Sequence, residues 1–462
     1  MESPSRPLSL VDATLLVMGG IIGIGIFFQP ASVAQHLPAP GPFLGAWVLG
    51  AILALAGAMT FAELGAMMPS TGGWYVFLRR GFGPLVAFCF AWVVLGVVAT
   101  GACAAVASFF GWRLALLLDV SGQVVLEGAG DLALTADTLL GFGAIVLITA
   151  AALLGLKRAA TLQAVCMGAK LLVIGTFIVA GYALTLSPPP PGDVVESAAR
   201  EVDWMKGWSR AMLPVLFTFG GWQLLSYVAP SVKDAPRNLP RAIVIGVVSV
   251  AIVYLVFNFA LLRVLGIDGL IASESAMQTF TTKTLGDSGA KVLDGAMALS
   301  AFGFLVATLI TTPGVLVAMS REGLFPRAFA HLHPRTGAPV LVLLLQAVVT
   351  TGYLLVYAND HEGRDMLADA VVFIEWVFHF LAAVALLRLA RSNPERPWRS
   401  PLFPLFPVVY AVLAVYVVGS NLESQPWSVT RIGLIPLSLG IVTYFAWRRF
   451  GGRAHDPSGP RP

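Results

Sequence analysis

Twelve long apolar segments constrain the fold of this chain more than any other feature of its sequence. Crossing the hydrocarbon layer of a bilayer takes roughly 20 apolar residues in a helix. The chain is 57% hydrophobic and only 12% charged, whereas soluble domains contain about 25% charged residues. We therefore predict an all-α integral membrane protein with 12 transmembrane helices. The predicted helices cover residues 12–35, 42–68, 84–112, 136–155, 159–186, 209–232, 240–266, 289–319, 338–358, 366–390, 402–420 and 430–449.

The basic residues lie mainly on alternate connections between these segments. If the N-terminus faces the cytoplasm, the connections on its side carry 19 lysine and arginine residues, and the opposite connections carry 9. Cytoplasmic connections of membrane proteins carry this kind of excess. We expect a multi-pass protein of the cell (inner) membrane with both termini cytoplasmic. The net charge of +4 reflects this distribution, so the lipid bilayer is the expected partner and nucleic acid is not.

The first apolar segment contains an unusual stretch at residues 18–27, which reads MGGIIGIGIF. Each of its four glycines weakens a helix by about 1 kcal/mol relative to alanine, so we predict a break in the helix here. A second stretch, LFTFGGWQ at residues 216–223, interrupts the sixth segment, and Gly20 and Gly220 lie 200 residues apart. Paired interruptions in the two halves of a chain are typical of a secondary transporter with a binding site at the membrane midplane.

Tight packing is the alternative interpretation of the first stretch. Gly19 and Gly23 form a GxxxG pattern, which membrane helices use to approach one another closely. Packing alone predicts no matching stretch at the start of the other half, and residues 216–223 supply one. We therefore favour broken helices.

A broken helix inside a bundle exposes main-chain groups. The half that restarts presents free N–H groups with a partial positive charge, and the half that stops presents free carbonyls with a partial negative charge. Two facing breaks therefore offer donors for a carboxylate and acceptors for an ammonium group, and an α-amino acid carries both. Each helix end contributes up to about 2 kcal/mol, so side chains must assist the binding.

Ionisable residues also lie inside the predicted helices. Lys170 lies about a third of the way into residues 159–186, and a lysine costs about 2.5 to 3.5 kcal/mol at the membrane centre. Snorkelling to the interface is the structural alternative, but intramembrane charges are functional hypotheses by default. Glu375 and His379 are four residues apart in the tenth segment, so they share one helix face.

Signatures of an enzyme or a metal centre are absent from the sequence. It has no HExxH pattern, no GxSxG pattern and no cysteine–histidine cluster, which the common hydrolases would show. His331 and His333 are too few to hold zinc. The three cysteines, Cys89, Cys103 and Cys166, are expected to be small core residues. We predict no enzymatic activity, no cofactor and no metal.

Six groups of motifs follow one another along nearly the whole chain. They are GGIIGIGIF with FQP, AELGAMMPSTGGWYVFLRRGFGP, the segment around Lys170, FTFGGWQ with KDAPRNLPRAI, SREGLFP with HPRT, and RPWRSPLFPLFP. Together they resemble the amino acid/polyamine/organocation superfamily, in its L-type amino acid transporter branch. The resemblance implies a LeuT-like fold of two inverted five-helix repeats, with helices 1 and 6 broken and two further helices. The implied divisions are an N-terminus (1–11), a first repeat (12–186), an outer loop (187–208), a second repeat (209–390), the last two helices (391–450) and a tail (451–462).

The resemblance also implies where a substrate would bind. Its carboxylate would meet the backbone of the first break, and its amino group would meet carbonyls of both breaks. Phe217 would be an aromatic gate, and Gln223 would bring a polar side chain to the site. Lys170 matches a family lysine that takes the place of sodium, which implies sodium-independent transport. The implied substrate-binding residues are Ile21, Gly23, Ile24, Gly25, Phe217, Thr218, Phe219, Gly220 and Gln223.

Some positions depart from the family pattern. Ile24, Ser231 and Gly314 stand where the family often has serine, glutamate and arginine. No cysteine lies between residues 113 and 137, so no disulfide-linked heavy chain is expected and a stand-alone bacterial member is implied. Glu375 is atypical as well, and it is a possible proton site or a determinant for a polar or basic substrate.

The expected function is exchange or facilitated transport of L-amino acids, most of them neutral, by alternating access. A proton-coupled symporter that uses Glu375 or Lys170 is the alternative within transport. A sensor that binds amino acids without carrying them, and a membrane-embedded enzyme, are the alternatives from other classes.

Overall fold

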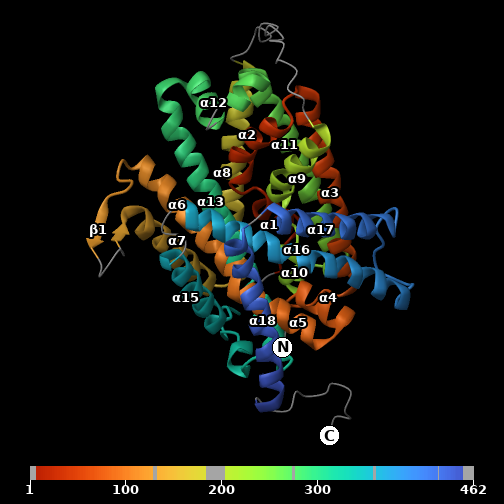
Figure 1. Cartoon of the computed structure of the whole chain (residues 1–462). Helices are drawn as coiled ribbons and strands as arrows, with labels where there is room; N and C mark the ends of the chain where they lie inside the picture. Colours follow the sequence, from red (N-terminus) through yellow and green to blue (C-terminus); the bar gives the residue numbers. More distant parts are fainter. Residues whose placement is uncertain are drawn as a thin grey trace.

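A computed structural model describes residues 7–127, 133–183, 203–272, 276–356, 361–424 and 426–450 (Figure 1). Most of the predicted outer loop (187–208), the predicted tail (451–462) and part of the predicted N-terminus (1–11) therefore lie outside the described residues. The helices and strands are α1 (Leu10–Ile21), α2 (Gly25–His36), α3 (Pro40–Met67), α4 (Trp74–Phe82), α5 (Pro84–Val93), the π-helical η1 (Val94–Val98), α6 (Ala99–Leu117), β1 (Val124–Glu127), β2 (Ala133–Thr135), α7 (Ala136–Leu153), α8 (Leu156–Ala183), α9 (Trp204–Phe219), α10 (Leu224–Tyr227), the 3-10 helix η2 (Ala229–Ser231), α11 (Ala235–Ala272), α12 (Ala276–Leu285), η3 (Gly286–Ser288), α13 (Gly289–Thr311), α14 (Pro313–Arg321), η4 (Arg327–Ala330), α15 (Val340–Val356), α16 (His361–Ser392), α17 (Leu405–Ser424) and α18 (Trp427–Phe450).

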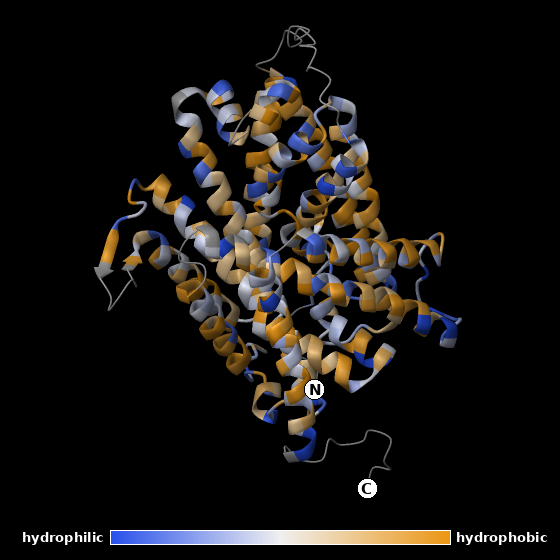
Figure 2. Cartoon of the chain, viewed as in Figure 1, coloured by the Kyte–Doolittle hydropathy of each residue, from blue (hydrophilic) through white to orange (hydrophobic). Residues whose placement is uncertain are grey.

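The predicted multi-pass membrane class is confirmed. Among the described residues, nine helical stretches are long and apolar enough to cross a membrane, and ten if the bent pair α1 and α2 forms one span. The bodies of the helices are mostly hydrophobic and hydrophilic residues gather at their ends and connections (Figure 2). The predicted segments 209–232 and 338–358 contain shorter helices, α9 with 16 residues and α15 with 17. The count of twelve therefore stays a prediction.

Besides helices, the described residues contain one short hairpin, which the all-α prediction missed, and an isolated parallel bridge between Leu8 and Val232. β1 and β2 pair antiparallel, with Val124 opposite Thr135. They lie in the connection between α6 and α7, where the sequence predicts only a loop outside the membrane. Such a hairpin pairs its own backbone groups in a connection that no helix covers.

Three connections predicted to lie on one side of the membrane meet in the structure. Arg79 on α4 forms an ion pair with Glu322 at 2.9 Å, and the Tyr75 hydroxyl donates to the same carboxylate at 3.0 Å. Burial raises the pKa of the Tyr75 hydroxyl, and the negative charge of the Glu322 carboxylate, which accepts its hydrogen bond, raises it further. The Trp447 indole, near the end of α18, donates to the Gly323 carbonyl at 3.0 Å.

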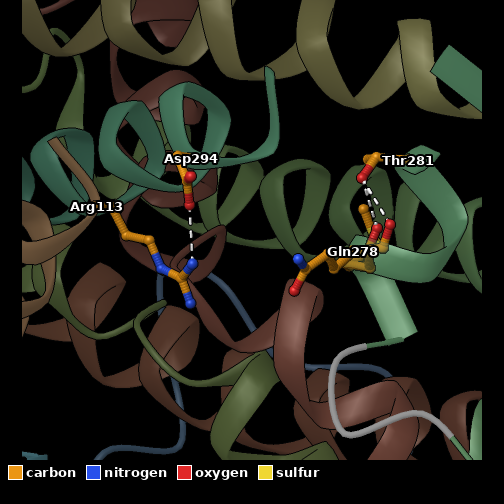
Figure 3. A network of polar contacts seen from close by, with 5 residues as sticks. Arg113, Gln278, Thr281 and Asp294 are labelled. Carbon is orange, nitrogen blue, oxygen red and sulfur yellow. Dashed lines mark hydrogen bonds and ion pairs between the residues drawn. The ribbon is translucent and has the colours of Figure 1, made fainter. Parts of the chain in front are cut away.

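The connections predicted for the opposite side also meet one another. Arg113, near the end of α6, forms an ion pair with Asp294 of α13 at 2.9 Å (Figure 3). Lys291 and Asp119 form a second pair at 2.6 Å between the same two regions. Each of these contacts joins parts of the chain that the distribution of basic residues places on the same side of the membrane.

Candidate functional site

The first predicted break is present in the structure. α1 ends at Ile21 and α2 begins at Gly25, and the two helices meet at an angle of 46°. Ile22 leaves the helical region with φ −73° and ψ 86°. The start of α1 is well formed, because Ser9 and Asp12 cap each other's backbone N–H groups. The interruption is therefore a local property of residues 22–24 and not of a generally weak helix.

The second predicted break is also present. α9 ends at Phe219, Gly220 is extended with φ −66° and ψ 158°, and α10 restarts at Leu224. Gly221 has φ +121°, a conformation that residues with a Cβ rarely adopt. The backbone of this break therefore depends on glycine at position 221.

The two breaks touch each other through their backbones. A Cβ added to Gly221 would lie 2.3 Å from the carbonyl oxygen of Gly20, and one added to Gly25 would lie 3.2 Å from the Cα atom of Thr218. The first distance is shorter than any real contact, and the second is tighter than most. Glycine is thus required where the two broken spans cross, and the crossing brings both sets of helix ends together.

Two other glycines of the breaks are partly accessible, and a Cβ added at either would make only ordinary van der Waals contacts. The nearest atom to a Cβ added at Gly23 is Cδ2 of Phe304 at 3.8 Å, and at Gly220 it is the Phe217 carbonyl oxygen at 3.5 Å. Gly19, in contrast, packs so closely against the Gln163 amide of α8 that a Cβ there would force this side chain to move. Packing therefore explains Gly19 but does not explain Gly23, and Gly23 and Gly220 leave bare backbone accessible between the breaks.

The carbonyl groups of the first break are held by side chains from neighbouring helices. The buried Lys170 ammonium of α8 donates to the Ile22 carbonyl at 2.5 Å, and the Ser300 hydroxyl of α13 donates to the Gly23 carbonyl at 2.8 Å. A Cβ added to Gly303 would lie 2.6 Å from Cε of Lys170. Gly303 therefore makes room for the lysine, which points inward to the break and does not snorkel.

Tyr254 of α11 links the two breaks, and the sequence analysis missed it. Its hydroxyl lies 3.2 Å from the Ile21 carbonyl, at the end of α1, and 3.2 Å from the Thr218 carbonyl, near the end of α9. The side chain is fully buried. No local signal marks this residue, because one tyrosine in an apolar helix is ordinary, and only the crossing of three helices gives it two acceptors.

The start of α2 carries the main-chain donors that the broken helix predicts. Among the described residues, the N–H groups of Ile24, Gly25 and Ile26 have no hydrogen-bond partner, as expected for the first turn of a helix. Gly23 differs, because its N–H donates to the Ile21 carbonyl at 2.8 Å. A substrate that contacts the Gly23 N–H or the Ile21 carbonyl would therefore replace protein hydrogen bonds.

Gln223 connects the second break to α16. Its amide nitrogen donates to Oε1 of Glu375 at 2.9 Å, and its amide oxygen accepts from the Gly221 N–H at 3.1 Å. The structure thus brings together two residues that the sequence analysis singled out separately. Glu375 lies beside the second break, while Lys170 lies at the first.

The aromatic and hydroxyl residues of α9 have different surroundings. Phe217 is 40% exposed even though it lies near the end of a predicted span. Phe219 is buried between Trp47 and Tyr254, with ring centroids 6.2 Å and 5.1 Å away. The Thr218 hydroxyl donates within its own helix, to the Pro214 carbonyl at 2.8 Å. The Phe217 ring is therefore partly accessible, whereas the Phe219 ring serves packing.

A match to the amino acid permease family extends over residues 8–444. The chain belongs to this family. The match covers both breaks and every helix that contributes to the site. Permeases of this family are transporters, so the prediction of amino acid transport without enzymatic activity is confirmed.

Individual relatives of this permease align over almost its whole length. The serine/threonine exchanger SteT of Bacillus subtilis is 28% identical over 96% of this chain and 97% of its own. The human b(0,+)-type amino acid transporter 1 is 27% identical over 96% of this chain and 88% of its own. The mouse Asc-type amino acid transporter 1 is 29% identical over 96% of this chain and 82% of its own. These relatives confirm the predicted link to the L-type branch of the superfamily.

Proposed function

We propose that this permease carries L-amino acids, most of them neutral, across the cell membrane by sodium-independent exchange or facilitated transport with alternating access. The observation that carries the proposal is the pair of facing breaks, with free N–H groups at the start of α2 and partly accessible backbone at Gly23 and Gly220. A zwitterion fits this arrangement, because its carboxylate seeks helix N-terminal donors and its ammonium seeks helix C-terminal carbonyls. The relatives are named as exchangers and amino acid transporters, which favours the same class.

Independence from sodium is proposed from the position of Lys170. Its ammonium donates to the Ile22 carbonyl, an oxygen of the unwound backbone at which transporters of broken-helix design coordinate a cation. The fixed ammonium of Lys170 at this oxygen takes the place of a bound cation, so the proposed mechanism needs no sodium ion there.

The proposed architecture is the LeuT-like arrangement of five plus five helices with two more, both termini being cytoplasmic. The ion pairs support its count of twelve spans. Asp119 and Lys291 are paired, so the chain crosses the membrane an even number of times between them. The long helices α7, α8 and α11 account for three crossings, and α9 with α10 supplies the fourth. The Trp447 indole contacts the Gly323 carbonyl, so an even number of crossings between them is proposed as well. The long helices α16, α17 and α18 account for three, and the proposal takes α15 as the fourth.

Counterflow in proteoliposomes tests the proposed function. Vesicles containing the purified protein are loaded with each of the 20 unlabelled amino acids in turn, and entry of a labelled one is followed with and without sodium. Accumulation that is independent of sodium is expected. Binding without accumulation would identify a sensor instead. Accumulation that follows an imposed pH gradient would favour the proton-coupled symporter.

Substitution of Phe217 by alanine is expected to weaken substrate binding by roughly tenfold, because a large aromatic side chain contributes on the order of 1.5 to 3 kcal/mol when a ligand covers it. The exposed Phe217 packs little in the absence of ligand, so the thermal stability of the protein should stay nearly unchanged. Competition binding with the purified variant measures the affinity. Unchanged affinity and rate would exclude Phe217 as the gate.

Substitution of Tyr254 by phenylalanine is expected to slow exchange about tenfold while the protein still folds. The ring and its packing are kept, but the hydroxyl that joins the Ile21 and Thr218 carbonyls is lost. The Ile21 carbonyl still accepts from the Gly23 N–H, whereas the Thr218 carbonyl loses this donor, and a buried acceptor without a partner costs about 1 to 3 kcal/mol. Initial rates of counterflow provide the measurement. A wild-type rate would show that the link between the two breaks does not matter for transport.

A further inference from the structure

Glu375 lies on the buried face of α16 and yet keeps an accessible oxygen. Phe378 and His379, one turn further along the helix, are buried. Glu375 itself is partly accessible, and its Oε1 atom accepts from Gln223. Its Oε2 atom has no hydrogen-bond partner among the described residues and is not enclosed by protein atoms. The accessible oxygen therefore belongs to a carboxylate that Gln223 joins to the second break.

The orientation of this carboxylate is fixed by the break itself. The Gln223 amide has its oxygen on the Gly221 N–H and its nitrogen on Glu375, which determines which way the amide points. Glu375 is thus tied through one side chain to the backbone that the substrate is proposed to contact.

Cationic side chains of the protein do not compensate Glu375. Among the described residues, no lysine, arginine or histidine forms an ion pair with it. Lys170 is bound to the first break, and the His379 ring bonds to the Tyr410 hydroxyl through Nδ1 at 2.5 Å. A carboxylate at membrane depth without a cation is costly, and a ligand with a positive charge would remove much of that cost.

We infer that Glu375 is a specificity-determining residue, whose Oε2 atom receives the ammonium or guanidinium group of a cationic amino acid. The permease then accepts dibasic amino acids as well as neutral ones, and it holds the α-amino and α-carboxylate groups of both in the same way. This inference rests on the proposed function, since it places the substrate backbone at the two breaks.

Lysine and norleucine form a matched pair of ligands for the test, because norleucine lacks only the side-chain ammonium. Each competes with labelled substrate for the purified permease in proteoliposomes. We expect the wild-type protein to bind lysine at least about tenfold more tightly than norleucine, as is typical when a desolvated charge gains its partner. In Glu375→Gln the advantage of lysine should disappear, while the affinity for norleucine stays within about twofold.

Two control variants complete the experiment. Glu375→Asp keeps the charge and should retain part of the preference for lysine. Glu395→Gln makes the same chemical change in the exposed connection between α16 and α17 and should leave both affinities unchanged. If Glu375→Gln lost affinity for lysine and for norleucine equally, the carboxylate would only support Gln223. That result would overturn the inference.

The wild-type protein separates this inference from the proposed function without any variant. Binding of norleucine without a preference for lysine overturns the role of Glu375 and leaves amino acid transport intact. Failure of all 20 amino acids to bind or exchange overturns the proposed function itself.

Discussion

Replacing Lys170 with alanine is expected to lower the rate of exchange by roughly tenfold to a hundredfold. The ammonium makes a charge-assisted hydrogen bond to the Ile22 carbonyl at 2.5 Å in a buried site, and such bonds contribute about 1.5 to 3 kcal/mol. Without it, the carbonyl is left without a donor and α8 loses its tie to the first break. Counterflow of a labelled amino acid in proteoliposomes measures the effect.

Lys157→Ala is the matched control for this variant. Lys157 lies on the same helix, near its start, and is partly accessible, so removal of its charge should leave the rate unchanged. Arginine is not expected to rescue position 170, because Gly303 leaves just enough room for the slender lysine chain. If Lys170→Ala exchanged at the wild-type rate, the ammonium would have no part in transport.

Replacing Gly221 with alanine is expected to destabilise the protein by about 3 kcal/mol or more, which ranks among the large effects of single substitutions. The new Cβ would lie 2.3 Å from the Gly20 carbonyl oxygen, and the backbone would keep φ +121°. Both effects force the crossing of the two broken spans apart. The melting temperature and the yield of monodisperse protein in detergent measure this loss.

Gly220→Ala is the neighbouring comparison and should behave in the opposite way. Its backbone is extended with φ −66°, which alanine adopts without strain, and the added Cβ meets nothing closer than 3.5 Å. We expect a stable protein that binds substrate more weakly, since the methyl group covers partly accessible backbone between the breaks. A stable Gly221→Ala protein, or an unstable Gly220→Ala protein, would contradict the conclusion that Gly221 is needed for close packing and Gly220 is not.

The proposed architecture and the candidate site were predicted from the sequence to different extents. Composition and hydropathy were enough to identify a helical membrane protein, and the glycine stretches marked both breaks to within a few residues, because lipid excludes unpaired backbone. The roles of the individual glycines could not be predicted. Gly19, Gly23, Gly220 and Gly221 look alike in the sequence, but only the crossing of the spans determines which of them meet a neighbour.

The sequence by itself determined which segments can lie in the bilayer, where their helices fail, and which charges are placed at membrane depth. These are local properties, governed by hydrophobicity and by the conformational freedom of glycine. The tertiary structure alone decided that Tyr254 would bridge the two breaks, that Ser300 would hold the Gly23 carbonyl, and that Gln223 would join Glu375. Such partnerships depend on the rotation and depth of helices that are far apart in the chain, and no local pattern of residues records them.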